Sequence, residues 1–212
     1  MDLSNTFSEC KVFNFRCYTL ATRQKANTYI ALCVVYKNVA IPIYWNQLDK
    51  NGGHSSQEDR QNLILQASEI FNLSGKVLLA DREFVGDEWL KFLKDAQIDF
   101  IIRLSKTCYK KRITQSIGVS HSSLEKKALK RKTAIGKVFR LNGNEYTFVA
   151  IKNAKKDIAE PVLFLISSLT NYKEITNTYR IRWRIETCFR QLKTKGFNIE
   201  VRWYPKAGHI FA

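Results

Sequence analysis

The 212-residue sequence is short of several features that define whole classes of protein. Its longest apolar run, Tyr29 to Tyr36, has fewer than half of the roughly 20 residues that a membrane-spanning helix needs. The opening MDLSNTFSEC has neither a basic start nor an apolar stretch, so it predicts no secretory signal. The five cysteines are odd in number and never spaced C-x-x-C, which favours free thiols over disulfides or a zinc site. We therefore expect a cytoplasmic protein with no membrane partner.

Acidic residues are scarce in the second half of the chain. Residues 1–100 contain 11 basic and 12 acidic side chains, whereas residues 101–212 contain 24 basic and 7 acidic ones, a net of +17. Hydrophobic residues make up 45% and aromatic residues 12% of the sequence, which is too apolar for a disordered basic tail. Because a catalyst of small neutral substrates has no need of this asymmetry, it predicts a folded protein that binds a polyanion.

Hydrophobic patterning predicts an alternation of strands and helices. We expect strands at 11–20, 28–36, 39–45, 76–80, 98–104 and 161–167, and helices at 57–72, 86–96 and 172–195. Pro42 indicates an edge strand or a bulge, and Ser56 is placed to cap the first helix. Residues 103–156 carry 15 basic and 2 acidic side chains in short alternating pieces with turn signals, which predicts a basic β-rich insertion.

A three-stranded meander followed by alternating helices and strands is the order of a ribonuclease-H-like (retroviral-integrase-like) α/β fold. We expect its core to comprise residues 11–104 and 159–200. The basic β-rich insertion then spans 105–158, before the last helix, and the ends, 1–10 and 201–212, are poorly defined.

Two places carry side chains suited to chemistry. Asp81 directly follows an apolar strand, at the ligand-binding edge of an open α/β sheet; taken alone, it favours a cap of the next turn. On the last predicted helix, Tyr179, Arg182, Glu186 and Lys193 are spaced 3, 4 and 7 residues apart and share one stripe, with Arg190 beside it. The alternative is a solvated face with an Arg182–Glu186 ion pair.

The spacing Y-x2-R-x3-E-x6-K of this stripe resembles the signature of bacterial DDE transposases, in the family named after insertion sequence four. Three further blocks are similar to the same family: VVYKNVAIPIYW (34–45), NGGHSSQEDR (51–60) and LLADREFVGDEWLKFL (78–93). The segment IRWRIETCFRQLKTKGFNIE (181–200) extends the match around the signature. The resemblance covers roughly residues 19–200. It implies DNA transposition, by metal-dependent cleavage and strand transfer at insertion-sequence ends.

The resemblance also implies roles for single residues. Asp81 and Glu186 would be catalytic carboxylates that bind a pair of Mg²⁺ ions, with Mn²⁺ as a substitute. Tyr179, Arg182 and Lys193, with Arg190 beside them, would hold DNA phosphates. Trp183 would stack on a displaced base, or else pack against the sheet. The expected partner is double-stranded DNA with terminal inverted repeats, bound by a possible homodimer on paired ends in the bacterial nucleoid.

The sequence departs from that family at the first catalytic aspartate. That residue belongs on the first strand, shortly before residues 28–36, but no acidic residue occurs between Glu9 and Asp49. The tail after Glu200 and the missing N-terminal DNA-binding region depart as well. We therefore expect a truncated copy with an incomplete two-metal site and impaired catalysis.

Several interpretations stay open. The chain is either a transposase-type enzyme or a non-enzymatic DNA-binding remnant, which metal-dependent strand transfer distinguishes. Another ribonuclease-H-like nuclease and an RNA- or ribosome-binding surface are weaker alternatives. A cluster of basic residues in the insertion is predicted to follow DNA phosphates, or else to serve only solubility. We call it the basic patch: Lys126, Lys127, Lys130, Arg131 and Lys132.

Overall fold

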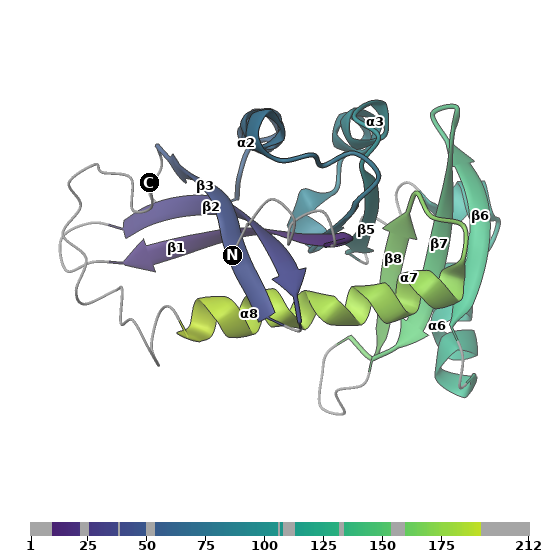
Figure 1. The fold of residues 1–212 in the computed structure, drawn as a ribbon. Coiled ribbons are helices and arrows are strands. Elements are labelled where there is room, and N and C mark those ends of the chain that lie inside the picture. The colour runs from purple at the N-terminus through teal and green to yellow at the C-terminus, as the bar shows by residue number, and fades with distance from the viewer. Residues whose placement is uncertain are drawn as a thin grey trace.

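The computed structural model describes residues 10–21, 26–37, 39–49, 54–105, 107, 113–131, 134–153 and 160–191. Within them, eight strands form one mixed sheet in the order β3-β2-β1-β4-β5-β8-β7-β6 (Figure 1). The strands are β1 (Val12–Ala21), β2 (Ala26–Tyr36), β3 (Val39–Leu48), β4 (Val77–Ala80), β5 (Asp99–Leu104), β6 (Ile135–Leu141), β7 (Asn144–Lys152) and β8 (Val162–Ser167).

The first five strands have the arrangement that the sequence predicts. β1, β2 and β3 form an antiparallel meander, and β4 and β5 then add in parallel on the other side of β1. Pro42 lies on β3, the edge strand, and the β2–β3 register shifts next to its pairing with Cys33. Because an edge position and a bulge both spare proline a ladder hydrogen bond, Pro42 is accommodated there, as predicted.

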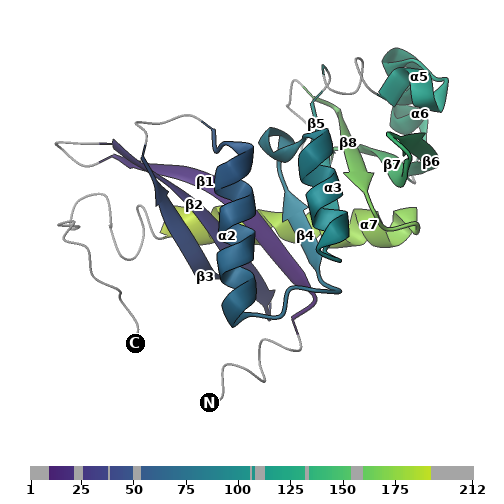
Figure 2. The ribbon, with the colours of Figure 1, turned by 90° about the horizontal axis from the view of Figure 1, so that it is seen from above.

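Two helices cover one face of the sheet, α2 (Gln57–Ile70) and α3 (Asp87–Asp95), as Figure 2 shows. Ser56 caps α2 in a reciprocal capping box with Asp59, which satisfies backbone N–H groups at the helix start. Beneath these helices, Phe15 on β1 packs edge-on against Phe84 at a centroid distance of 5.1 Å. Trp89 of α3 is fully buried beside them.

The last helical segment crosses the opposite face of the sheet, from β7 to β2 and β3 (Figures 1 and 2). It consists of α7 (Tyr172–Tyr179), a 3-10 turn η3 (Arg180–Arg182) and α8 (Trp183–Arg190). The long helix predicted over 172–195 is present within the described residues, and η3 tightens the backbone at its middle. The predicted residues beyond 191 lie outside the described part of the chain.

The basic segment between β5 and β8 is only partly β-structure. It begins with α5 (Thr114–Ile117) and α6 (His121–Lys130), and only then forms the β6–β7 hairpin, which extends the same sheet. The prediction of a β-rich insertion is thus wrong for its first half, because Leu124 and Ala128 bury one face of α6 at a spacing of four residues. Asn142 and Gly143 form the turn of this hairpin, and both residues have positive φ.

The helices were compared with the length and apolar character of membrane-spanning helices. None of those in the described ranges combines the length and the apolar character that crossing a bilayer requires.

Candidate functional site

The register of the sheet sets a cation beside Asp81. On β1 and β4, Asn14 pairs with Leu79 in parallel. Two residues further along each strand direction, Arg16 lies level with Asp81, which directly follows β4. The sequence places the missing first aspartate on the first strand, shortly before residues 28–36; the β1 residue that the register brings level with Asp81 is Arg16.

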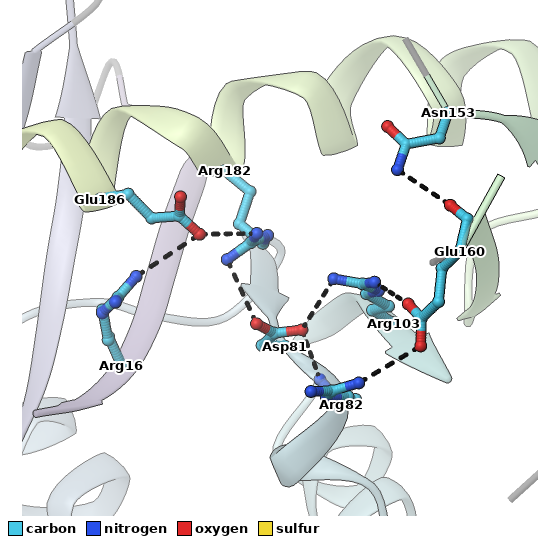
Figure 3. A network of polar contacts seen from close by, with 8 residues as sticks. All are labelled: Arg16, Asp81, Arg82, Arg103, Asn153, Glu160, Arg182 and Glu186. Carbon is cyan, nitrogen blue, oxygen red and sulfur yellow. Dashed lines mark hydrogen bonds and ion pairs between the residues drawn. The ribbon is translucent and has the colours of Figure 1, made fainter. Parts of the chain in front are cut away.

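The neighbouring strand on the other side contributes a second cation. Ala80 pairs with Ile102 on β5, so the next residue, Arg103, also lies level with Asp81. Arg103 Nη1 is 3.7 Å from Asp81 Oδ1. The three adjacent strands therefore present an Arg–Asp–Arg row at one end of the sheet (Figure 3).

Arg182 links Asp81 to Glu186 from above this row. Its Nη2 atom donates a hydrogen bond to Glu186 Oε1 at 2.8 Å, and its Nη1 atom lies 3.7 Å from Asp81 Oδ2. Burial disfavours the charged guanidinium, but Tyr179, Asp81 and Glu186 outweigh that effect and raise the pKa of Arg182. The helix and the strand end thus converge as the sequence predicts, with a buried arginine rather than open space between the two carboxylates.

Glu186 binds a second guanidinium. Arg16 Nη1 lies 3.5 Å from the same Oε1 atom that accepts the bond from Arg182. Figure 3 shows Arg16 approaching Glu186 from the side of β1. One carboxylate oxygen is therefore shared between cations from two different elements.

Asp81 caps the turn that follows it, as one of its two interpretations predicts, and it also forms ion pairs. Its Oδ1 atom accepts a hydrogen bond from the backbone N–H of Arg82 at 2.8 Å, which caps the 3-10 turn η1 (Arg82–Phe84). The same side chain makes the ion pairs with Arg103 and Arg182. Capping fixes the carboxylate at the edge of the sheet, where it faces the last helical segment.

Glu160 is a further member of the cluster that the sequence did not reveal. It lies just before β8 and binds the guanidinium of Arg103, and its Oε1 atom is 3.3 Å from Arg82 Nη1. Arg16 and Arg103 were missed as well, although a polar residue within an apolar strand signals each of them. Asn14 and Arg16 alternate with Phe13 and Phe15 on β1, and such alternation marks one polar sheet face.

Tyr179 is on the predicted face but lies buried. Its side chain packs with Leu79 and Ile175, and only 6% of it is exposed. Burial raises the pKa of its phenol well above the ordinary value, with a smaller opposing effect of Arg182. Arg182 stacks at 5.7 Å from the centre of this ring. The predicted contact of Tyr179 with DNA phosphates stays a prediction.

The remaining predicted DNA contacts are more open. Trp183 is 42% exposed, so it is not packed away against the sheet, and the Arg182 guanidinium lies 5.8 Å from its ring centre. Arg190 is exposed at the end of α8. In the basic patch, Lys126, Lys127 and Lys130 are exposed on α6, and Arg131 is exposed just after it. Lys193 and Lys132 lie outside the described residues.

The donor set does not fit the expected pair of divalent ions. No group of three His, Cys, Asp or Glu side chains that could hold a metal occurs in the described ranges. Asp81 and Glu186 are each in contact with two guanidinium groups. Unit charges about 4 Å apart interact by about 4 kcal/mol at an effective dielectric constant of about 20, and a divalent ion doubles that repulsion. The cluster is therefore arranged as a network of ion pairs.

Two solved structures are similar to this chain although their sequences differ widely from it. A piggyBac transposase, solved as a synaptic complex with hairpin DNA, matches with a TM-score of 0.51 at 12% identity, over 86% of this chain. This chain spans 40% of the length of that one. Endonuclease V from Ciona intestinalis, solved with DNA, matches with a TM-score of 0.48 at 14% identity, over 89% of this chain and 88% of that one. The likeness to the transposase and the strand order confirm the ribonuclease-H-like α/β fold.

Sequence comparison identifies the family. The curated proteins contain no match to this chain. A family profile described as "Transposase DDE domain" does match, over residues 28–206. The matched range includes β2, the whole Asp81–Glu186 region and the last helical segment. The chain therefore belongs to the transposase DDE domain family.

Proposed function

We propose that this protein binds the ends of an insertion sequence as a DDE transposase of the family named after insertion sequence four, and that its cleavage activity is severely impaired. Membership of the DDE domain family supports the transposition part of the proposal. The net charge of +17 over residues 101–212 supports a DNA partner. The impaired cleavage rests on the cluster around Asp81.

The single observation that carries the proposal is Arg16 at the strand position level with Asp81. Metal-assisted phosphodiester cleavage needs carboxylates that hold two divalent ions against the attacking and leaving oxygens. Two carboxylates, Asp81 and Glu186, are present, and arginines contact both of them. We therefore expect the protein to lose the stabilisation of the transition state by bound metal and to keep the binding of DNA phosphates along its surface.

The DNA partner is double-stranded DNA carrying the terminal inverted repeats, held by two copies of the chain on paired ends. The piggyBac transposase of similar fold was solved in a synaptic complex with DNA, which supports this assignment by analogy. Among the described residues, Trp183, Arg190 and four members of the basic patch, Lys126, Lys127, Lys130 and Arg131, are exposed and would contact the DNA. Their contacts with phosphates would position the duplex without reading its sequence.

Cleavage and binding assays on one duplex test the proposal. A labelled terminal repeat is incubated with the protein and with E186Q, in Mg²⁺ or Mn²⁺, beside a scrambled duplex. We expect the repeat to be bound in a gel-shift assay and to be cleaved only slowly, with this slow cleavage lost in E186Q. Cleavage over many turnovers that disappears in E186Q would refute impaired catalysis, and equal affinity for the scrambled duplex would refute binding to the ends.

A non-enzymatic DNA-binding remnant is the second candidate. It is favoured by the ion pairs that occupy both carboxylates, since these need no metal to be satisfied. The same assay separates it from an impaired enzyme. Slow cleavage that depends on Mn²⁺ and on Glu186 indicates the enzyme, whereas its complete absence over long incubation indicates the remnant.

A further inference from the structure

The cluster around Asp81 and Glu186 is internally neutralised. Glu186 Oε1 lies 2.8 Å from Arg182 Nη2 and 3.5 Å from Arg16 Nη1. Asp81 lies 3.7 Å from both Arg182 and Arg103. The side chains of Asp81 and Glu186 are 36% and 28% exposed, so solvent reaches them, yet each already has cationic partners.

Arg16 differs from the other arginines in its position. Arg182 comes from the helical segment and Arg103 is also held by Glu160, whereas Arg16 lies on β1, within the Arg–Asp–Arg row. Its partner on β2 is Ala31, which adds no charge. Two residues earlier on β1, Asn14 is fully buried and neither of its amide atoms has a hydrogen-bond partner among the described residues. This strand thus presents an amide and a cation where a carboxylate would complete a three-acid set.

We propose that Arg16 acts as a fixed counter-cation beside the Asp81–Glu186 pair and that its charge, added to those of Arg182 and Arg103, excludes divalent cations from the site. The inference builds on the proposed loss of cleavage but concerns a different property, the affinity for metal without DNA. It follows that replacing Arg16 by aspartate converts the cluster into a divalent-cation site. The ligands would be oxygen atoms from β1, from the end of β4 and from α8, with water completing the shell.

Charge arithmetic gives the direction of the effect. Arg16, Arg182, Asp81 and Glu186 together carry a net charge of zero, from two cations and two anions. R16D removes one positive charge and adds one negative charge, so the same four positions then carry a net of −2. Hard divalent cations bind oxygen ligands, and their affinity rises with the number of charged ligands. We expect R16D to bind Mn²⁺ about a hundredfold more tightly than the unmodified protein.

Titration with MnCl₂ tests the inference on the full chain without DNA. The loss of the free Mn²⁺ signal in electron paramagnetic resonance and isothermal titration calorimetry both measure binding. The unmodified protein should show no one-to-one binding, R16D should bind one or two ions, and R16D/E186Q should lose most of that gain. R140D is the matched control, because Arg140 is an exposed strand arginine paired only loosely with Glu145 at 3.8 Å; it should gain nothing.

Two results overturn the inference. One is stoichiometric Mn²⁺ binding by the unmodified protein that D81N abolishes. The other is a folded R16D, judged by circular dichroism, that binds no more Mn²⁺ than R140D. If R16D does not fold, R16M replaces it, since it removes the cation and keeps the apolar stem. R16M should still bind Mn²⁺ about tenfold more tightly than the unmodified protein, and no gain in R16M is equally decisive against Arg16 as the excluding group.

Discussion

Arg182 is a buried cation that is held by two carboxylates from different elements. Its side chain is 8% exposed, between Asp81 at the end of β4 and Glu186 on α8. A buried charge is costly unless it is paired, so the guanidinium and the two carboxylates depend on each other. The contact therefore joins the last helical segment to the strand end at one point.

Removing this cation should destabilise the fold measurably. R182M keeps an apolar stem of similar length but leaves Asp81 and Glu186 without their shared partner. Removing one member of a fully buried pair costs about 3–5 kcal/mol; because both carboxylates stay partly exposed, we expect a loss of about 2 kcal/mol in the free energy of unfolding. Urea denaturation followed by circular dichroism measures this loss.

The control for that prediction is R140M. Arg140 is 80% exposed and pairs with Glu145 on the neighbouring strand, and such surface pairs contribute about 0–1 kcal/mol. A loss in R182M no greater than that in R140M would contradict the role assigned to Arg182.

At the scale of elements, the last helical segment is held at its start by a close approach to the sheet. Gly136 on β6 lies under Tyr172, the first residue of α7. A Cβ atom added at Gly136 would stand 2.6 Å from Tyr172 Cβ and 2.8 Å from its Cγ. Real Cβ atoms do not approach so closely, so any larger residue must displace α7 or β6.

G136A should therefore destabilise the fold although it adds one methyl group. We expect a loss of about 1–3 kcal/mol in the free energy of unfolding, the usual range for overpacking. The matched control is G86A, because Gly86 has extended backbone and its added Cβ would meet neighbours only at 3.9 Å. Thermal unfolding of both variants decides the point, and equal melting temperatures would contradict the tight contact.

The elements that were predicted correctly are those whose pattern is local. A β-branched and aromatic run identifies the strand around Tyr29, a short apolar run identifies the strand around Leu78, and Ser56 marks the start of its helix. All three patterns depend on near neighbours in the sequence. The helix α6 was missed because lysines on its exposed face obscure the pair Leu124 and Ala128. The tightening at η3 has no sequence signal that we recognise.

The site was predicted in outline for the same physical reason. Asp81 and Glu186 follow from a strand end and a helix stripe, each readable alone. Arg16 and Arg103 depend on which strands flank β4 and in which register, and that is a long-range property of the sheet. The ion-pair network that replaces a metal pair therefore became visible only once the strand order was known.

For the whole molecule, positive charge is concentrated beyond residue 100, and part of it lies outside the Asp81 cluster. The described members of the basic patch lie on the exposed face and at the end of α6. His121 and Glu125, on the inner side of the same helix, line a small hollow together with Arg103 and Glu160. The helix α6 therefore borders the cluster with one face and presents the patch on the other.

If the basic patch follows DNA phosphates, its removal should lower the salt dependence of binding. Each phosphate contact contributes about 0.9 to the slope of log affinity against log salt concentration, so replacing all five residues with alanine should reduce the slope by several units. The control, K11A/K37A/K91A, removes exposed lysines outside the insertion and should change the slope by less per charge. Fluorescence anisotropy with a labelled duplex over a salt series measures both. An unchanged slope in the patch variant, with affinity also unchanged, would restrict the DNA footprint to the last helical segment and assign the patch to solubility alone.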